Sequence, residues 1–92
     1  SDLSILVAAS SLERVTATRA AQSFAEAALD AEQKKLENGK STSFQVLSLQ
    51  RDLVQAQQNF ISALSNYNIA LVNLAWAEGS LLEKLKVNVT VR

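Results

Sequence analysis

The chain has 92 residues, of which nine are basic and nine acidic, so its formal net charge is zero. This length limits it to a single domain, and the charge balance provides no basic surface for nucleic acid. Because Cys and His are both absent, disulfides, thiol chemistry and the commonest general base and metal ligand are excluded. We therefore expect neither an enzyme nor a bound cofactor or metal.

The first half of the chain predicts one long helix, over about residues 3–38. It contains no Pro, whose ring would interrupt helix hydrogen bonds. Ser10-Ser11-Leu12-Glu13 matches a capping box and allows a start near Ser11. No breaker lies upstream, however, so we favour a start near Leu3. The predicted buried face is Ala-rich and loosely helical: Leu12, Val15, Ala17, Ala20, Ala21, Phe24, Ala27, Ala28, Ala31 and Leu36.

The segment Glu37–Gln45 carries the stop signals of one helix and the start signals of another. Lys34 and Lys35 place positive charge in the last turn, where the helix dipole favours it. Asn38-Gly39 then supplies a left-handed cap, and Thr42-Ser43-Phe44-Gln45 is a capping box for the next helix. Such a short connection predicts that the two helices run antiparallel.

Two other patterns lie near this turn. Gly39-Lys40-Ser41-Thr42 looks like the end of a phosphate-binding P-loop. That motif requires another Gly where this chain has Lys34, and it follows a strand instead of a helix, so we exclude nucleotide binding. Asp30 and Lys34 are four residues apart in the favourable order and predict an exposed ion pair.

The second half predicts a longer helix, over about residues 42–84, with apolar positions that alternate by three and four. Large side chains occupy one heptad position: Val46, Leu53, Phe60, Tyr67, Leu74 and Leu81. The other position begins with Leu49 and continues as Ala56, Ala63, Ala70 and Ala77. A second stripe lies one residue over: Leu47, Val54, Ile61, Leu64, Leu71 and Leu82. One partner helix would not cover both stripes, so we expect two neighbours, as in a bundle or a closed ring.

The stretch Leu53–Ala77 contains no charged residue and is long enough to span a membrane. It nevertheless carries many amides and hydroxyls, which argue against exposure to lipid: Gln55, Gln57, Gln58, Asn59, Ser62, Ser65, Asn66, Asn68 and Asn73. We interpret this polar face as ordinary helix surface, as the lining of a water-filled space, or as a contact with another protein.

The end of the chain contains weaker signals. Gly79-Ser80-Leu81-Leu82-Glu83 predicts a break or kink in the second helix, with a short restart. Residues 87–92 alternate in a strand-like way, and we expect an extended tail there. The whole chain is thus predicted to be all-α: one long, antiparallel, coiled-coil-like helical hairpin over residues 1–92, packing further in an oligomeric bundle.

The segment Glu37–Ala56 resembles the second periplasmic helix-turn-helix of TolC-like outer membrane efflux proteins. The family pattern is a Glu-x-Gly turn, a hydroxyl-rich start, an aliphatic-Leu pair and a Gln-Arg-x-Leu-x-x-Ala run. Here these are Glu37-Asn38-Gly39, Ser41-Thr42-Ser43, Val46-Leu47 and Gln50–Ala56. Tyr67–Leu74 and Gly79–Leu82 resemble the same family's Tyr-x-x-Ala-x-x-x-Leu helix and its closing Gly-Thr-Leu-Leu. The resemblance covers roughly residues 12–82.

The resemblance implies a passive channel in the outer membrane of Gram-negative bacteria. In that family three protomers build an outer membrane β-barrel and a long periplasmic α-barrel, to which each protomer gives two pairs of helical arms. This chain would be one pair in the periplasm, and membrane contact would come from parts outside it. The turn would meet a periplasmic adaptor protein, which links the channel to an inner membrane efflux pump or type I secretion transporter.

The resemblance also assigns roles to residues of the turn. The expected tip and adaptor contacts are Gly39, Lys40, Ser41, Thr42 and Ser43, and the expected tip-packing and gate-equivalent positions are Phe44, Gln45, Val46, Leu47 and Ser48. Some family members have a basic residue two after the tip Gly and acidic residues further along. Here Ser41, Gln45 and Ser48 are uncharged, which predicts gating by packing and hydrogen bonds. Alternatively, the turn residues merely cap and solubilise the hairpin.

A purely structural role is an alternative to the channel function. The hairpin could be a coiled-coil or oligomerisation module, such as the hairpin of a periplasmic adaptor, although no lipoyl-like β segments flank it here. The first residues, Ser1-Asp2-Leu3, include neither an initiator Met nor an apolar signal segment, and we interpret the chain as a segment of a longer protein. Because two helices cannot bury both apolar stripes, the isolated chain should self-associate, for example into a four-helix bundle.

Overall fold

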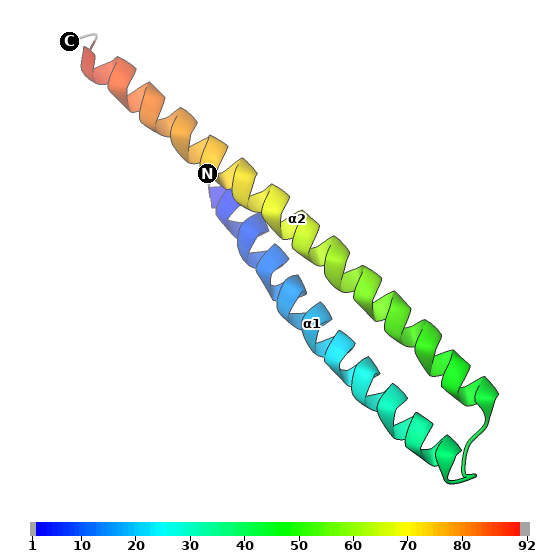
Figure 1. Ribbon diagram of the computed structural model, residues 1–92. Helices are drawn as coiled ribbons and strands as arrows, with labels where there is room; N and C mark the ends of the chain where they lie inside the picture. Colours follow the sequence, from blue (N-terminus) through cyan, green and yellow to red (C-terminus); the bar gives the residue numbers. More distant parts are fainter. Residues whose placement is uncertain (1, 91–92) are drawn as a thin grey trace.

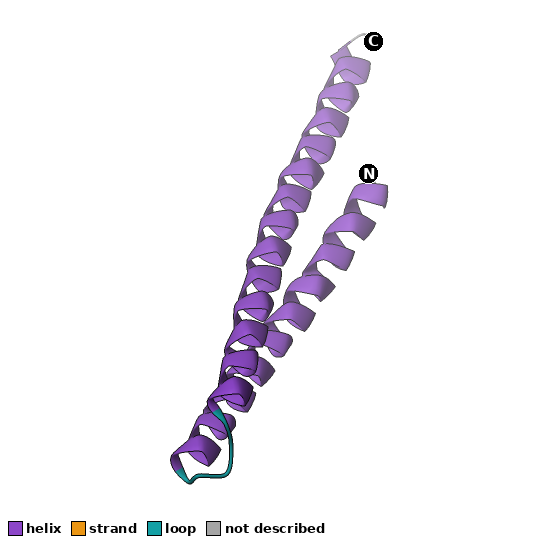
Figure 2. Ribbon diagram, turned by 90° about the vertical axis from the view of Figure 1, so that its right-hand side faces the viewer, coloured by secondary structure: helices purple, strands orange, loops and turns teal. Residues whose placement is uncertain are grey.

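The protein is a single antiparallel helical hairpin, as the sequence predicted (Figure 1). The structure, a computed structural model, describes the backbone of residues 2–90 and the side chains of residues 2–87. Helix α1 spans Asp2–Glu37 and helix α2 spans Ser43–Thr90. The two helices lie side by side along one long axis and are joined only by a short loop at one end (Figure 2).

Helix α1 runs without interruption through the predicted alternative start at Ser10–Glu13. No Pro interrupts it, and hydroxyl groups within it bond to carbonyls of their own helix. The Thr16 hydroxyl donates to the Leu12 carbonyl at 3.2 Å, and the Thr18 hydroxyl donates to Arg14 and Val15 carbonyls at 2.8 and 3.1 Å. The expected start near Leu3 is confirmed within one residue.

Two predictions about the end of α2 are wrong. The helix continues through Gly79 without a break, and it includes residues 87–90, where we expected an extended tail. Residues 91 and 92 of that predicted tail lie outside the described residues. A single helical Gly costs only about 1 kcal/mol relative to Ala, and adding a residue to an existing helix is far easier than nucleating a new element. The local breaker signals were therefore too weak to end the helix.

The predicted heptad positions of α2 form the contact with α1, and we call them the inner seam. Ala63 is the most buried residue of the chain at 1% exposure, and Val46, Ala56 and Ala70 are also buried. The remaining members are half-buried: Leu49, Leu53, Phe60, Tyr67, Leu74 and Ala77. Leu81, which we also placed in this seam, is exposed instead. The later part of α2 extends past the start of α1 (Figure 1).

Helix α1 meets α2 through a different face from the one predicted. Its buried and half-buried residues repeat every seven positions in two sets: Ala8, Val15, Gln22, Leu29 and Leu36, and Ser4, Ser11, Thr18, Ala25 and Glu32. Of the predicted face, only Val15, Ala28 and Leu36 are not exposed. Small side chains on this face complement the bulky ones of the inner seam. Thr18 can lie there because its hydroxyl is satisfied by backbone carbonyls.

Several apolar residues of α1 form an exposed stripe on another face of the helix. Five of them belong to the predicted pattern and follow spacings of three and four: Ala17, Ala20, Phe24, Ala27 and Ala31. Leu3 and Leu6 lie on the same face and are exposed as well. We call this set the α1 outer stripe. Phe24 is 77% exposed, which is unusual for an aromatic side chain that could be buried. Within the hairpin, nothing covers this stripe.

The second stripe predicted on α2 is also left uncovered, as expected for a face that one partner helix cannot reach. Leu47, Val54, Ile61, Leu71 and Leu82 are all exposed, and Leu64 is half-buried. Among the side chains that the structure describes, eighteen large apolar ones are exposed, whereas the buried residues are two Val and four Ala. The hairpin thus leaves far more apolar surface outside than it encloses. Within residues 2–90, neither helix combines the length and hydropathy that a membrane span requires.

Candidate functional site

The end of α1 is closed by a Schellman motif, which positions the turn. The Lys40 amide donates to the Lys35 carbonyl at 2.8 Å, and the Gly39 amide donates to the Leu36 carbonyl at 3.0 Å. Gly39 has a φ of 71°, in the left-handed region that L side chains rarely adopt. A Cβ at this position would meet no atom within 4 Å. Gly39 is therefore required for its backbone conformation and not for space.

Thr42 caps the start of α2, as predicted, but the Gln45 side chain does not have the partner that a capping box gives it. The Gln45 amide donates to Thr42 Oγ1 at 3.2 Å, which is the first half of a capping box. The Gln45 side chain does not complete the box. Its Oε1 accepts a hydrogen bond from the Ser41 hydroxyl at 3.1 Å instead. Ser41 and Gln45 are thus joined by a neutral hydrogen bond.

Charge at the turn is concentrated on Lys40, which is the only charged residue between Glu37 and Arg51. Its side chain is exposed, and no carboxylate among the described residues pairs with it. By contrast, Lys34 pairs with Asp30 at 3.1 Å, as predicted, and Lys35 lies 3.9 Å from Glu32. Lys40 therefore presents an uncompensated positive charge at the end of the hairpin, beside the hydroxyl groups of Ser41–Ser43.

The predicted tip-packing residues divide into two groups. Val46 is buried in the inner seam at 8% exposure. Phe44 and Leu47 do not pack the tip within the hairpin, because they are 77% and 45% exposed. Val46 lies on the face of α2 that contacts α1, whereas Phe44 and Leu47 lie on faces that point away from α1. Ser48 is exposed as well.

Sequence reasoning located the turn but missed two features of the site. The Ser41–Gln45 hydrogen bond was missed because the capping-box pattern assigns the Gln side chain to a backbone amide. The exposed stripe of α2 also extends further than predicted, since Leu85 and Asn68 lie on it. Continuing the seven-residue spacing from Leu64 and Leu47 would have found both. Among the described residues, no group of three or more His, Cys, Asp and Glu could hold a metal ion.

In comparisons with known proteins, no family model, curated protein or solved structure matched this chain. Arguments about function therefore rest on the motif resemblance at the turn and on the surfaces of the hairpin.

Proposed function

We propose that this hairpin forms part of the periplasmic helical wall of a TolC-like outer membrane channel, with the turn at the adaptor-facing tip. The observation that carries the proposal is that both helices present a second heptad stripe outside the hairpin. A free-standing hairpin needs one stripe per helix. A helix in a wall needs two, because it has a neighbour on each side.

The directions of these stripes fit a curved wall. Successive residues of a helix are about 100° apart, so the exposed stripe of α2, one residue over from the inner seam, points about 100° away from α1. The α1 outer stripe is two residues over from the residues of α1 that face α2, so it points about 160° away from α2, on the side that continues the wall. The directions of the two stripes differ by roughly 60°, so each hairpin is rotated by that angle relative to the next, and about six hairpins close a ring. Three protomers with two pairs of arms each would supply six.

The turn supports the tip assignment by its chemistry. Lys40 and Ser43 are exposed to a polar partner, the Ser41 and Thr42 hydroxyls beside them bond to Gln45, and Phe44 offers an exposed apolar side chain. The Ser41–Gln45 hydrogen bond supplies local order without an ion pair. We propose that the tip contacts a periplasmic adaptor protein, and that it is held closed by packing and neutral hydrogen bonds.

The proposal is tested in the complete channel protein that carries this hairpin, produced in cells with its adaptor and pump. A photo-crosslinking residue is placed at Lys40 or Ser41, and, as a control, at Gln58, which is exposed in the middle of α2. We expect crosslinks to the adaptor from the two tip positions and none from the control. Gly39→Val, which removes the left-handed turn, should abolish these crosslinks and increase drug sensitivity. Unchanged crosslinking together with unchanged drug sensitivity would overturn the proposal.

A further inference from the structure

The exposed stripe of α2 is a complete heptad seam of its own, which we call the outer seam. One heptad position holds Leu47, Val54, Ile61, Asn68, Ala75 and Leu82, and the other holds Gln50, Gln57, Leu64, Leu71, Glu78 and Leu85. Except for the half-buried Gln57 and Leu64, all of these residues are exposed. Ile61 is 64% exposed, at the middle of the helix. The outer seam thus runs along almost the whole of α2 with no partner in the hairpin.

We propose that two copies of this chain associate side by side, in parallel and in register, through their outer seams. In this dimer each Asn68 faces Asn68 of the second copy. The inference does not rest on the channel function, because it concerns the 92-residue chain by itself. It specifies which surface and which orientation the predicted self-association uses.

The residue types of the outer seam favour two parallel strands. Val54 and Ile61 are β-branched and occupy one position, and Leu64 and Leu71 occupy the other. These four residues at the centre of the seam have the distribution that parallel two-stranded coiled coils prefer, whereas Leu47 and Leu82 at the first position and Gln50, Gln57 and Glu78 at the second do not follow it. A single Asn at the β-branched position is a device that fixes register and strand number at a cost in stability. Asn68 is such a residue, since its neighbours along the seam, Ile61 and Ala75, are apolar.

An antiparallel arrangement matches the same seam less well. When two copies of the seam are aligned in opposite directions over their full length, Leu47 of one copy meets Leu85 of the other. In this alignment the numbers of any two facing residues have the same sum. Asn68 would then face Leu64. Its amide would be desolvated against an apolar side chain without a hydrogen-bond partner, which is unfavourable. In the parallel arrangement Asn68 can bond to its own copy across the seam.

The outer seam is accessible and large enough for a stable dimer. Helix α1 lies about 100° away around α2, so that it does not block the approach of a second copy. The seam from Leu47 to Leu85 forms a strip about 57 Å long and one helix diameter, about 10 Å, wide. The side chains on this strip add to its accessible area. They bring that area closer to the about 800 Å² that each partner buries in a specific interface. The contact uses the same surface on both copies and therefore closes at a dimer.

The α1 outer stripe is a weaker candidate for this contact. It consists mainly of Ala, and Ser10, Glu13 and Lys34 interrupt its spacing. Ala side chains bury little apolar area, and a buried charge without a partner is costly. The outer seam has one charged member, Glu78, near its end. We therefore assign the second copy to the outer seam of α2.

Cysteine crosslinking tests the surface and its direction, because the natural chain contains no Cys. Leu47→Cys and Leu82→Cys each place one thiol at an end of the outer seam. Under mild oxidation each variant should give a disulfide-linked dimer, since equivalent residues meet in the parallel arrangement. Ser62→Cys, exposed on another face of α2, should give none. Crosslinks only in a mixture of Leu47→Cys and Leu85→Cys would show antiparallel pairing, and crosslinks from Ala27→Cys would show the α1 outer stripe; either result overturns the proposal.

Sedimentation equilibrium of matched variants tests the energetics of the same surface. Ile61→Asp places a charge in the outer seam, whereas Ile69→Asp places one at a similarly exposed Ile outside it, at 56% against 64% exposure. Ile61→Asp should weaken the dimer at least tenfold, and Ile69→Asp should leave it unchanged. Circular dichroism should show that both variants stay helical. A monomeric natural chain at high concentration, or equal effects of the two variants, would contradict the proposal.

Discussion

The inner and outer seams of α2 differ in the size of their side chains, and this difference explains which one faces α1. The inner seam pairs bulky residues such as Phe60 with a row of Ala, of which Ala63 is the most buried residue of the chain. One position of the outer seam holds Leu, Val and Ile with Asn68 and Ala75, and the other holds three Leu with Gln50, Gln57 and Glu78. Small residues allow two backbones to approach closely, so that the short turn can bring α1 and α2 together. The larger side chains of the outer seam remain available for contact with another molecule.

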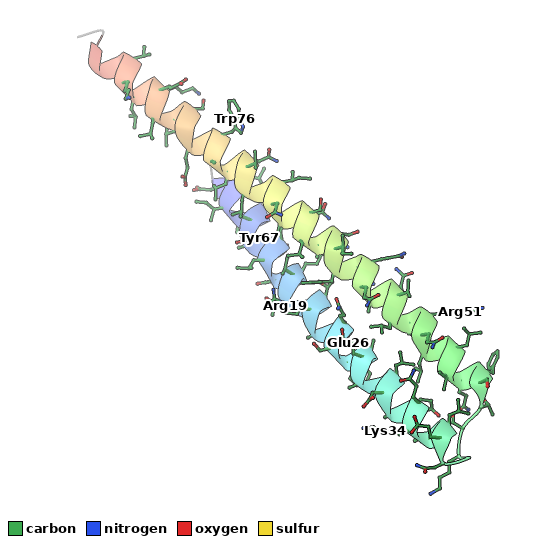
Figure 3. The ribbon with its side chains drawn as sticks, viewed as in Figure 1. Arg19, Glu26, Lys34, Arg51, Tyr67 and Trp76 are labelled. Atoms are coloured by element: carbon green, nitrogen blue, oxygen red, sulfur yellow. The ribbon has the colours of Figure 1, made fainter. Side chains whose placement is uncertain are left out.

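The residues buried between α1 and α2 are therefore only part of the apolar surface of this protein. The inner seam is covered by one helix, and its polar surroundings on α1 include Gln22 and Glu32. The outer seam offers Leu, Val and Ile side chains that α1 does not cover. Trp76 also projects from α2 away from α1 (Figure 3). A chain with this distribution is built to be covered by neighbours.

The largest effect should come from overfilling the inner seam. Ala63→Leu inserts a branched side chain at a residue that is only 1% exposed, which should lower stability by about 1–3 kcal/mol, or about 5–20 °C in the melting temperature. Ala75→Leu makes the same change on the exposed outer seam and should not lower it. Thermal circular dichroism at one fixed protein concentration measures both, since association stabilises the folded chain. Equal losses would show that the two seams do not differ in packing.

A smaller effect should distinguish the two glycines. Gly39→Ala forces an L side chain into the left-handed region and should cost about 1–2 kcal/mol, although no atom blocks its Cβ. Gly79→Ala lies within the continuous helix α2 and should stabilise it by up to about 1 kcal/mol. Urea unfolding followed by circular dichroism checks both signs. A loss of stability for Gly79→Ala would indicate that α2 is interrupted there after all.

The smallest effect concerns the contact between Arg19 and Phe60 (Figure 3 labels Arg19 on α1). The guanidinium carbon lies 5.5 Å from the ring centroid, within the range of a cation–π interaction. Arg19→Ala should therefore destabilise the hairpin by about 0.5–1 kcal/mol. Arg14→Ala, at an exposed position of the same helix, serves as the control. A double-mutant cycle with Phe60→Leu should show coupling for Arg19 and none for Arg14.

Most of the hairpin could be predicted from the sequence because its signals are local and strong. The Schellman turn at Gly39, the cap at Thr42 and the heptad repeat of α2 each depend on residues within a few positions of one another. The face of α1 could not be predicted, because Ala and Ser are distributed around most of the helix and define no preferred side. Leu12 and Phe24 belong to the Ala-rich, roughly helical pattern of the sequence, yet both are exposed.

The candidate site also combines features that local sequence predicts with features that depend on the fold. Thr42 and Gly39 were found from capping rules, whereas the Ser41–Gln45 hydrogen bond depends on how the turn is folded. The helical course of α2 through Gly79 and residues 87–90 was missed because short breaker and strand patterns do not outweigh helix propagation.

The sequence by itself determined that this chain folds back once at Glu37–Gln45, and that α2 carries two apolar seams of which one α-helix can cover only one. Only the tertiary structure decided how α1 is rotated, which of its residues face α2, and that its own apolar stripe is left outside. The physical reason is that heptad spacing and caps are properties of a single helix. The rotation of a weakly patterned helix depends on the surface of its partner, and here α1 turns a mixed face, from Ser4 and Ala8 to Leu29 and Leu36, toward the inner seam.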